Sequence, residues 1–414
     1  MKITYFHQAM FERFNRSSLI TGSALRDSSP VSLGRGRVAL SLFVYLFAQM
    51  TLTAEIDLGN KGALALGLDT RLEHNSNIIL DSTEESDFIA IAQPKILYRY
   101  NEGSVLVDAF IGVEFHEYDQ ASEYDSDSIK SGFSIDYPYG GRSENYELKF
   151  SGGYNETTSA DPRLQAVVAR EVLDLNLIGR YFFTERYSVL SGVRYRDRDT
   201  LTAGFNDVET IILPVDFFYS YSEALRFGAG YRFRETNVSG VPMPASSKDH
   251  ALYLVVEGRI SPSVDAEIRV GAQKRDFEEK AYNGSDSFFF ESALEWNASS
   301  QSVVELRAGQ EFDTSAANNS VETKYIDLGY KHKFDEKISM NAKIGYKQDE
   351  YTRLTTGGQF QTNDEVYAEL GGQYVLIENR LVLNALVRHS DQTSDNVRAE
   401  YDQTLARLGL SFIY

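Results

Sequence analysis

The sequence predicts an all-β fold, a transmembrane antiparallel up-and-down β-barrel of about 18 strands. Three observations predict it. Apolar and polar residues alternate with a period of two from Ala63 onward, short and long connections alternate between the strands, and the last strand ends on an aromatic residue, Tyr414. One face of each strand would then contact lipid, and the other would line a polar lumen.

Composition fits this fold and excludes several other classes. The chain of 414 residues has no Cys and a formal net charge of −19. The lack of Cys excludes a disulfide scaffold, a lipid anchor on Cys and a Cys-based metal site. The acidic balance argues against nucleic acid as a partner. The 26 Tyr and 25 Phe residues suit aromatic girdles at two membrane interfaces, and we expect no cofactor.

Residues 1–54 are predicted to be an N-terminal extension and signal peptide, and residues 55–414 the barrel. A basic flank at 34–37 precedes an apolar run at 38–48. That run has the length of a signal-peptide core and is short for a membrane helix. Residues 52–54 (Leu-Thr-Ala) form an acceptable cleavage site. The alternative is an N-terminal membrane anchor.

The strands repeat one pattern. In the strand from Ala63, Leu66 and Leu68 share one face, while Gly67 and Asp69 share the other. The strands that begin near residues 105, 146, 225, 264 and 338 alternate in the same way. Glycine beside long charged residues on the polar face suits a crowded lumen, because small residues leave space for long ones. A soluble sandwich would not need this combination.

The connections are predicted to differ at the two ends of the barrel. Short ones are expected at 101–103, 139–142, 184–186, 220–222, 261–263, 297–300, 335–336 and 378–379. Long polar ones are expected at 75–86, 117–127, 155–165, 197–207, 235–248, 278–286, 313–320, 349–363 and 391–400. An even number of strands places both termini on the periplasmic side. No loop looks long enough for a folded plug, although one bent inward could narrow the pore.

The final strand resembles the C-terminal strand of Gram-negative outer-membrane barrels. Its apolar face carries Leu410, Phe412 and Tyr414, and the resemblance implies recognition by the barrel-assembly machinery. Lipid and lipopolysaccharide of the outer membrane are the other expected partners. Acidic loops such as the one with Glu84 and Glu85 could attract cations that bridge to lipopolysaccharide, or could simply keep the loops solvated.

Arginine is frequent on the predicted lumen face and could form a basic ladder for an anionic solute or polymer. The predicted lumen-lining residues are Arg194, Arg196, Arg198, Arg226, Arg232, Arg234, Arg259, Arg269, Arg275, Glu257, Asp265 and Glu267. The acidic members, with Asp174 and Asp216, leave internal pairing as an equally strong interpretation. Tyr253, Tyr325 and Tyr367 also point inward, where they could stack on sugars or fill space.

No catalytic or metal-binding pattern stands out. The His residues after the predicted signal peptide are scattered and show no spacing typical of a Ser-His-Asp triad or a metal site. His116 next to Glu114 is a weak catalytic pattern. We therefore expect a protein that is not an enzyme.

The opening of the predicted barrel carries a family resemblance. Residues 68–78 end a first strand with Asn-Ser-Asn, and residues 85–89 (Glu-Ser-Asp-Phe-Ile) and 93–95 (Gln-Pro-Lys) follow. This opening resembles the putative beta-barrel porin type-2 family, whose members often occur in exopolysaccharide operons, and the even spacing of strands extends the resemblance over the mature chain. It implies an outer-membrane channel and supplies no catalytic residues.

The resemblance and the pattern together predict a channel in the outer membrane of a Gram-negative bacterium. Its expected role is passage or export of a polysaccharide or other hydrophilic solute, with periplasmic and inner-membrane export partners. A general or solute-selective porin for uptake is the first alternative. A structural or adhesive surface barrel is the second.

Overall fold

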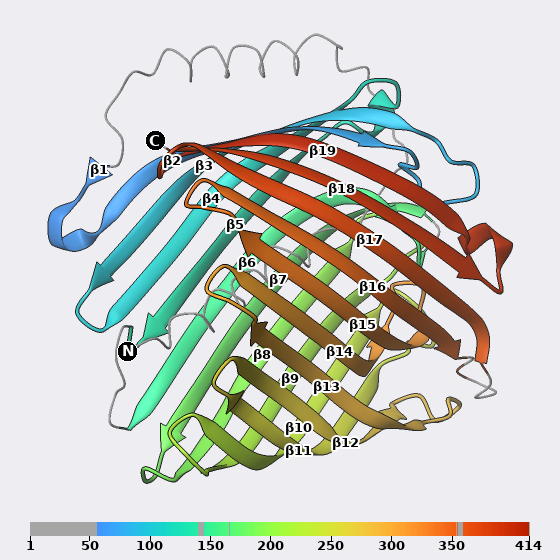
Figure 1. The fold of residues 1–414 in the computed structure, drawn as a ribbon. Coiled ribbons are helices and arrows are strands. Elements are labelled where there is room, and N and C mark those ends of the chain that lie inside the picture. The colour runs from blue at the N-terminus through green and yellow to red at the C-terminus, as the bar shows by residue number, and fades with distance from the viewer. Residues whose placement is uncertain (1–55, 140–144, 165, 353, 355–358, 414) are drawn as a thin grey trace.

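The computed structural model describes residues 56–139, 145–164, 166–352, 354 and 359–413. Strands β2 to β19 form one closed antiparallel barrel of 18 strands (Figure 1). Pairing of β19 with β2 closes the ring, and a short strand, β1 (Ile56–Asp57), pairs with the start of β2. The predicted fold and strand number are confirmed. The predicted extension and signal peptide, residues 1–54, lie outside the described residues.

Consecutive strands are neighbours throughout the barrel. Their bounds are β2 Ala63–Asn75, β3 Asp87–Glu102, β4 Val105–Tyr118, β5 Ser126–Tyr137, β6 Tyr146–Asp161, β7 Ala166–Phe182, β8 Tyr187–Thr200, β9 Asp207–Ser220, β10 Leu225–Ser239, β11 Ser247–Ser261, β12 Val264–Phe277, β13 Ser285–Asn297, β14 Ser302–Thr314, β15 Ser320–Lys333, β16 Ile338–Thr352, β17 Gln359–Ile377, β18 Leu381–Ser394 and β19 Tyr401–Ile413. Three short 3-10 helices are η1 (Gly59–Lys61), η2 (Ser122–Tyr124) and η3 (Val397–Ala399). No helix within the described ranges is long and apolar enough to cross a membrane.

Alternation along the strands sorts side chains between the two faces of the wall. Leu72 of β2 and Leu408 of β19 are opposite each other in the register and are 54% and 55% exposed on the outer face. The adjacent inner-face residue Glu73 is only 6% exposed. The apolar face therefore surrounds the barrel and is available to lipid, while the charged face is turned inward.

The two ends of the barrel differ. The start of β2 and the end of β19 lie at one end, named here the terminal end, because Gly67 pairs with Ile413 (Figure 1). Aromatic side chains such as Phe183, Tyr221 and Phe334 are exposed there on short connections. This distribution suits a membrane interface, where amphipathic rings are favoured. The opposite end, named the loop end, carries the connection 76–86 and most of the other longer links, although the connection 138–145 lies at the terminal end.

Most connections at the loop end are shorter than predicted. Residues 155–161, expected in a long loop, instead pair with residues 166–172 as the ends of β6 and β7. These stretches contain β-branched residues such as Thr157, Thr158, Val167 and Val168, which favour strands. The prediction took polar composition as a sign of a loop, whereas here the polar residues belong to a hairpin.

At two places near the loop end, a strand separates from the strand next to it. The β5–β6 ladder stops at Lys130 and Asn155, although β6 continues to Asp161. The β13–β14 ladder extends only to Phe290 and Gln310, although both strands continue beyond that pair. The barrel wall therefore leaves its regular path at these two places, and both departures shape the lumen.

Candidate channel lumen

The register places all twelve residues of the predicted lumen set on the inner face. They come from β8 (Arg194, Arg196, Arg198), β10 (Arg226, Arg232, Arg234), β11 (Glu257, Arg259) and β12 (Asp265, Glu267, Arg269, Arg275). These strands are close together in the sheet, with only β9 intervening. The set therefore forms one side of the inner wall, as the alternation indicated.

Most of these arginines are paired with carboxylates of the same wall. Arg226 contacts Glu257 at 2.9 Å, and Arg180 of β7 reaches the same carboxylate at 2.7 Å. Arg269 contacts three carboxylates, those of Asp216, Glu267 and Glu291. The remaining pairs are Arg196 with Asp174, Arg232 with Glu291, Arg234 with Glu311, and Arg259 with Asp265. Internal pairing thus outweighs a free basic ladder on this wall.

Arg234 and Arg275 also bind backbone near the place where β13 leaves β14. Arg234 donates to the carbonyl of Phe312, and Arg275 donates to the carbonyl of Asp313 at 2.7 Å. Arg275 is fully buried and forms two bonds of 2.7 Å to Asp249. These contacts tie β10 and β12 to β14 across the sheet, which is a structural role rather than recognition of a solute.

Arg194 and Arg198 differ from the other members of the set. Neither forms a hydrogen bond or an ion pair with another residue in the described part of the chain. Both lie on β8, on either side of the paired Arg196. These two guanidinium groups are what remains of the predicted basic ladder.

An apolar cluster fills part of the lumen beside these charges. Phe218, Tyr253 and Phe289 are at most 3% exposed and contact one another from β9, β11 and β13. Arg180 lies over the ring of Phe218, and Arg232 lies over that of Phe289, with the guanidinium carbon 4.5 Å from the ring centre. Sequence reasoning missed the two Phe residues, although their positions in the alternation put them on the inner face.

The three inward tyrosines are engaged rather than free. The hydroxyl of Tyr253 donates to Asp216 at 2.6 Å, and that of Tyr367 donates to Asp327. Lys343 and Arg388 also lie against the ring of Tyr367. Tyr325 packs closely against Gly309 of the neighbouring strand. The arrangement favours packing over a track on which sugars would stack.

The connection 76–86 folds over the lumen at the loop end. Asn77 is completely buried, and its amide donates to the carbonyls of Asp81 and Asp402. Its side-chain oxygen accepts from the backbone of Leu80, which is itself buried. One residue of the predicted Asn-Ser-Asn signature therefore anchors an inward loop, so the expectation that a bent loop could narrow the pore agrees with the geometry.

The end of the β6–β7 hairpin also crosses the lumen. Arg163 lies in its turn and binds Asp349 through Nε and Nη2, both at 2.9 Å. It also contacts Asp313 at 2.5 Å and Thr323 at 3.0 Å. These partners belong to β14, β15 and β16, about half a circuit of the barrel from β6 and β7. Burial alone would lower the pKa of Arg163, but Asp349 and Asp313 outweigh it and raise that pKa well above its ordinary value.

Beneath these two segments lies a cavity of about 180 Å³. Its charged lining comes from β2, from β4 to β6 and from β17 to β19, and includes Arg71, Glu73, Glu114, Arg388 and Arg407. Ile78, Leu80, Ala160 and Pro162 of the inward segments add to apolar side chains of the wall such as Ile89. The cavity is therefore amphipathic and faces the hollow part of the lumen.

Glu114 organises one wall of this cavity. Lys130 and His116 contact one of its carboxylate oxygens at 2.5 and 2.7 Å, and Arg71 contacts the other at 3.2 Å. His116 and Glu114, the pair noted in the sequence, are thus part of a lattice of charges. The described residues contain no group of three or more His, Cys, Asp or Glu side chains arranged to hold a metal ion.

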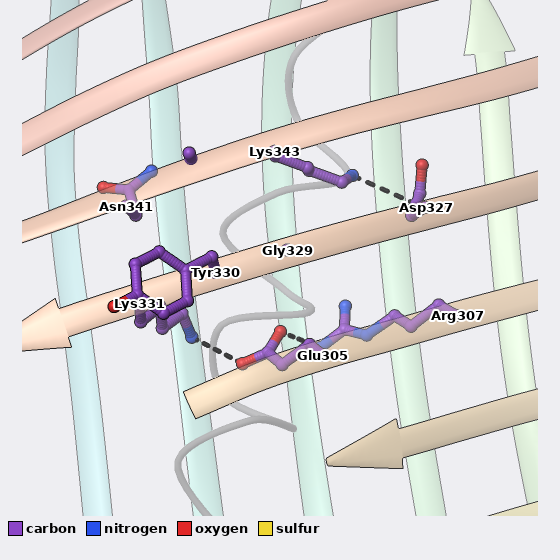
Figure 2. Close-up of a pocket in the computed structure, with 9 residues that line it drawn as sticks. Glu305, Arg307, Asp327, Gly329, Tyr330, Lys331, Asn341 and Lys343 are labelled. Carbon is purple, nitrogen blue, oxygen red and sulfur yellow. Dashed lines mark hydrogen bonds and ion pairs between the residues drawn. The ribbon is translucent and has the colours of Figure 1, made fainter. Parts of the chain in front are cut away.

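The charge lattice continues toward the terminal end on β14, β15 and β16 (Figure 2). Glu305 accepts from Lys331 at 2.8 Å and from Arg307 at 3.4 Å, and Lys343 contacts Asp327 at 3.1 Å. Side chains of opposite sign alternate around a hollow of about 20 Å³. Pairing of charges is therefore general around the inner wall.

Leu410 and Phe412 of the predicted assembly signal lie on β19, and Tyr414 lies outside the described residues. Leu410 is 40% exposed on the outer face. The position is compatible with recognition from the lipid side.

Comparison with known proteins supports the resemblance. The family model described as Putative beta-barrel porin 2 matches residues 250–413. No curated protein matches the chain in sequence.

Several solved barrels have a similar overall shape. OccK2 (OpdF) of Pseudomonas aeruginosa is 11% identical with a TM-score of 0.48, over 84% of this chain and 97% of that one. OccAB4 of Acinetobacter baumannii is 11% identical with a TM-score of 0.47, over 85% and 97%. OpdK of Pseudomonas aeruginosa with vanillate is 12% identical with a TM-score of 0.45, over 85% and 98%.

The family match, the closed barrel and its polar inner wall agree with one another. The chain forms a closed, porin-like β-barrel with a polar inner wall, and its residues 250–413 match the beta-barrel porin 2 family.

Proposed function

We propose that this channel passes an uncharged or weakly charged hydrophilic solute, with export of a polysaccharide as its leading role. The paired inner wall is the observation that carries the proposal. Closely spaced charges of opposite sign cancel at longer distance, so they produce little net attraction for either ion type. They still offer donors and acceptors at short range, which is what a polyhydroxylated chain requires.

The proposal includes an orientation and partners. The terminal end faces the periplasm, so that both termini are periplasmic and export partners dock on its short connections. Leu410, Phe412 and Tyr414 present the assembly signal to the barrel-assembly machinery. The acidic loop end faces outward, where lipopolysaccharide is its neighbour. The exposed aromatic residues at the terminal end support a position at a membrane interface.

A solute-selective porin for uptake is the second candidate, and one observation favours it. Arg194 and Arg198 lie on the inner face without a direct ion pair among the described residues, and only longer-range interactions with Glu291 and Asp313 offset their charge. Guanidinium groups bind carboxylates and phosphates in preference to neutral sugars. If these two residues dominate the local field, the channel prefers small anions.

Planar-bilayer recordings on the full purified chain, joined with swelling of proteoliposomes, separate these functions. We expect measurable conductance, weak ion selectivity in the reversal potential, and swelling with neutral oligosaccharides. Strong anion selectivity with exclusion of neutral oligosaccharides supports the uptake porin instead. Absence of current and swelling, from protein whose fold is shown by heat-modifiable gel mobility, contradicts both channel functions.

A further inference from the structure

We propose that the tip of the β6–β7 hairpin, residues 156–164 and 166–168, is a gate across the lumen that Arg163 holds closed. The inference rests on the proposed channel function. It adds a moving part and names the contact that controls it.

The hairpin tip is separated from the barrel wall on one side. The β5–β6 ladder ends at Asn155, so the last residues of β6 form ladder bonds only with β7, although the Glu156 side chain still accepts from the backbone of Ile129 in β5. On the other side, the β7–β8 ladder begins at Arg170, and the backbone of Ala169 is still bonded to Leu201 and Thr202, so the tip leaves the wall before Ala169. The two strands of the tip thus stay hydrogen-bonded to each other while they leave the wall, so the tip would move as one unit.

The tip reaches the far wall through few contacts. Arg163 provides the polar ones, to Asp313, Thr323 and Asp349. Ala160 and Val167 provide the apolar ones, in a small cluster with Leu80 and Tyr401. Pro162 and Val168 of the tip are buried as well, so Arg163 is the main polar attachment and acts together with this apolar contact.

The far wall can release Arg163 without leaving its carboxylates unpaired. Asp349 also contacts Lys347 at 2.7 Å and accepts a hydrogen bond from Thr323 at 2.6 Å. Asp313 lies within electrostatic range of Arg198, which has no hydrogen bond or ion pair among the described residues. Unpaired buried charge is what normally makes such a bond costly to break. Here each carboxylate keeps a cation, so an open state is accessible.

The lining of the cavity indicates which space the gate would open to the outer mouth. Thr157, Ser159, Ala160 and Pro162 of the tip form part of its lining, opposite the charged walls of β2, β4, β5 and β17 to β19. Movement of the tip toward β5 would join this cavity to the outer mouth. Closure by the tip would narrow the loop end of this barrel of 18 strands with a segment of its own wall.

Single-channel recordings on Arg163→Ala test the gate. We expect the open probability to rise about tenfold over the unchanged chain, as removal of the main polar attachment shifts a two-state equilibrium. Arg163→Lys should give an intermediate value, because a lysine keeps the charge but cannot form the two-pronged contact. Arg186→Ala is the matched control, since it removes an exposed arginine from the connection between β7 and β8 at the terminal end.

A disulfide gives an independent test that keeps Arg163 and its contacts in place. The chain has no Cys, so Leu80→Cys with Ala160→Cys creates one possible bond, between the tip and the connection 76–86. The oxidised form, verified by gel mobility, should stay closed and should regain openings on reduction. Equal conductance in all variants, oxidised or reduced, overturns the gate and leaves the channel. Absence of current from every folded variant, Arg163→Ala included, contradicts the channel itself.

Discussion

The two sides of the lumen obey the same alternation but are built from different residues. On β9, β11 and β13, inner positions hold Phe218, Tyr253 and Phe289, which fill the space between strands. On β2, β4 and β18, inner positions hold charged residues such as Arg71, Glu114 and Arg388 around a cavity. A barrel of this size is too wide to be filled by side chains everywhere. Filling one side therefore leaves the passage on the other.

The difference gives ion pairs on the two sides different roles. On the filled side, Arg275 is completely buried and joins β12 to β11 and β14. On the hollow side, Arg71 shares Glu114 with two other cations next to open space. We infer that charges of the first kind stabilise the barrel and that charges of the second kind face the solute.

The largest expected effect is the loss of an aromatic ring from the filled side. Phe289→Ala should lower the free energy of unfolding by about 4 kcal/mol, because it removes a buried ring and leaves a cavity. Leu386→Ala, which removes an inner-face side chain beside the hollow cavity, should cost about 1 kcal/mol, because solvent can replace it. Urea unfolding in detergent micelles measures both. Equal losses of stability from the two variants would contradict the distinction between a filled side and a hollow side.

The next largest effect on the free energy of unfolding should come from the loss of a buried arginine. Arg275→Ala should lower the free energy of unfolding by about 3 kcal/mol, since it leaves the buried Asp249 without its cation. Arg71→Ala should cost less, about 1 kcal/mol, because Glu114 keeps Lys130 and His116. Adding Asp249→Asn to Arg275→Ala should recover part of the loss. If it recovers none, the contacts of Arg275 with β14 carry its effect instead.

The sequence was sufficient for those features that depend on neighbouring residues. Period-two alternation is local, so it predicted the strand count and the inner position of Arg194 or Arg269. It could not show that Arg269 meets Asp216, Glu267 and Glu291, because such contacts depend on the register of several strands. Arg163 was missed for the same reason, since its partners lie 150 and 186 residues away. The inner positions of Phe218 and Phe289 were available from the alternation but were not used.

Ion selectivity tests the lumen arginines that lie at the boundary between the filled side and the hollow side. Arg194→Ala with Arg198→Ala should lower the anion-to-cation permeability ratio by about two- to threefold, because neither guanidinium forms an ion pair among the described residues and Glu291 and Asp313 act on them only at longer range. Arg232→Ala should change it less, since it also frees Glu291 from one of its cations. Reversal potentials in a salt gradient give the ratios. A larger change from Arg232→Ala would show that pairing does not cancel its charge.

The smallest effect should come from an exposed pair on the inner wall near the terminal end. The side chain of Arg259 is 46% exposed, and its Nε lies 3.4 Å from Asp265. Arg259→Ala should change the free energy of unfolding by less than about 0.5 kcal/mol, because water screens the pair and solvates Asp265 once it is alone. Conductance and selectivity should also stay close to those of the unchanged chain. Thermal unfolding and bilayer recordings on one preparation measure these quantities together. A large loss of stability would mean that exposed pairs also hold the wall, and burial would no longer separate the structural arginines from those that face the solute.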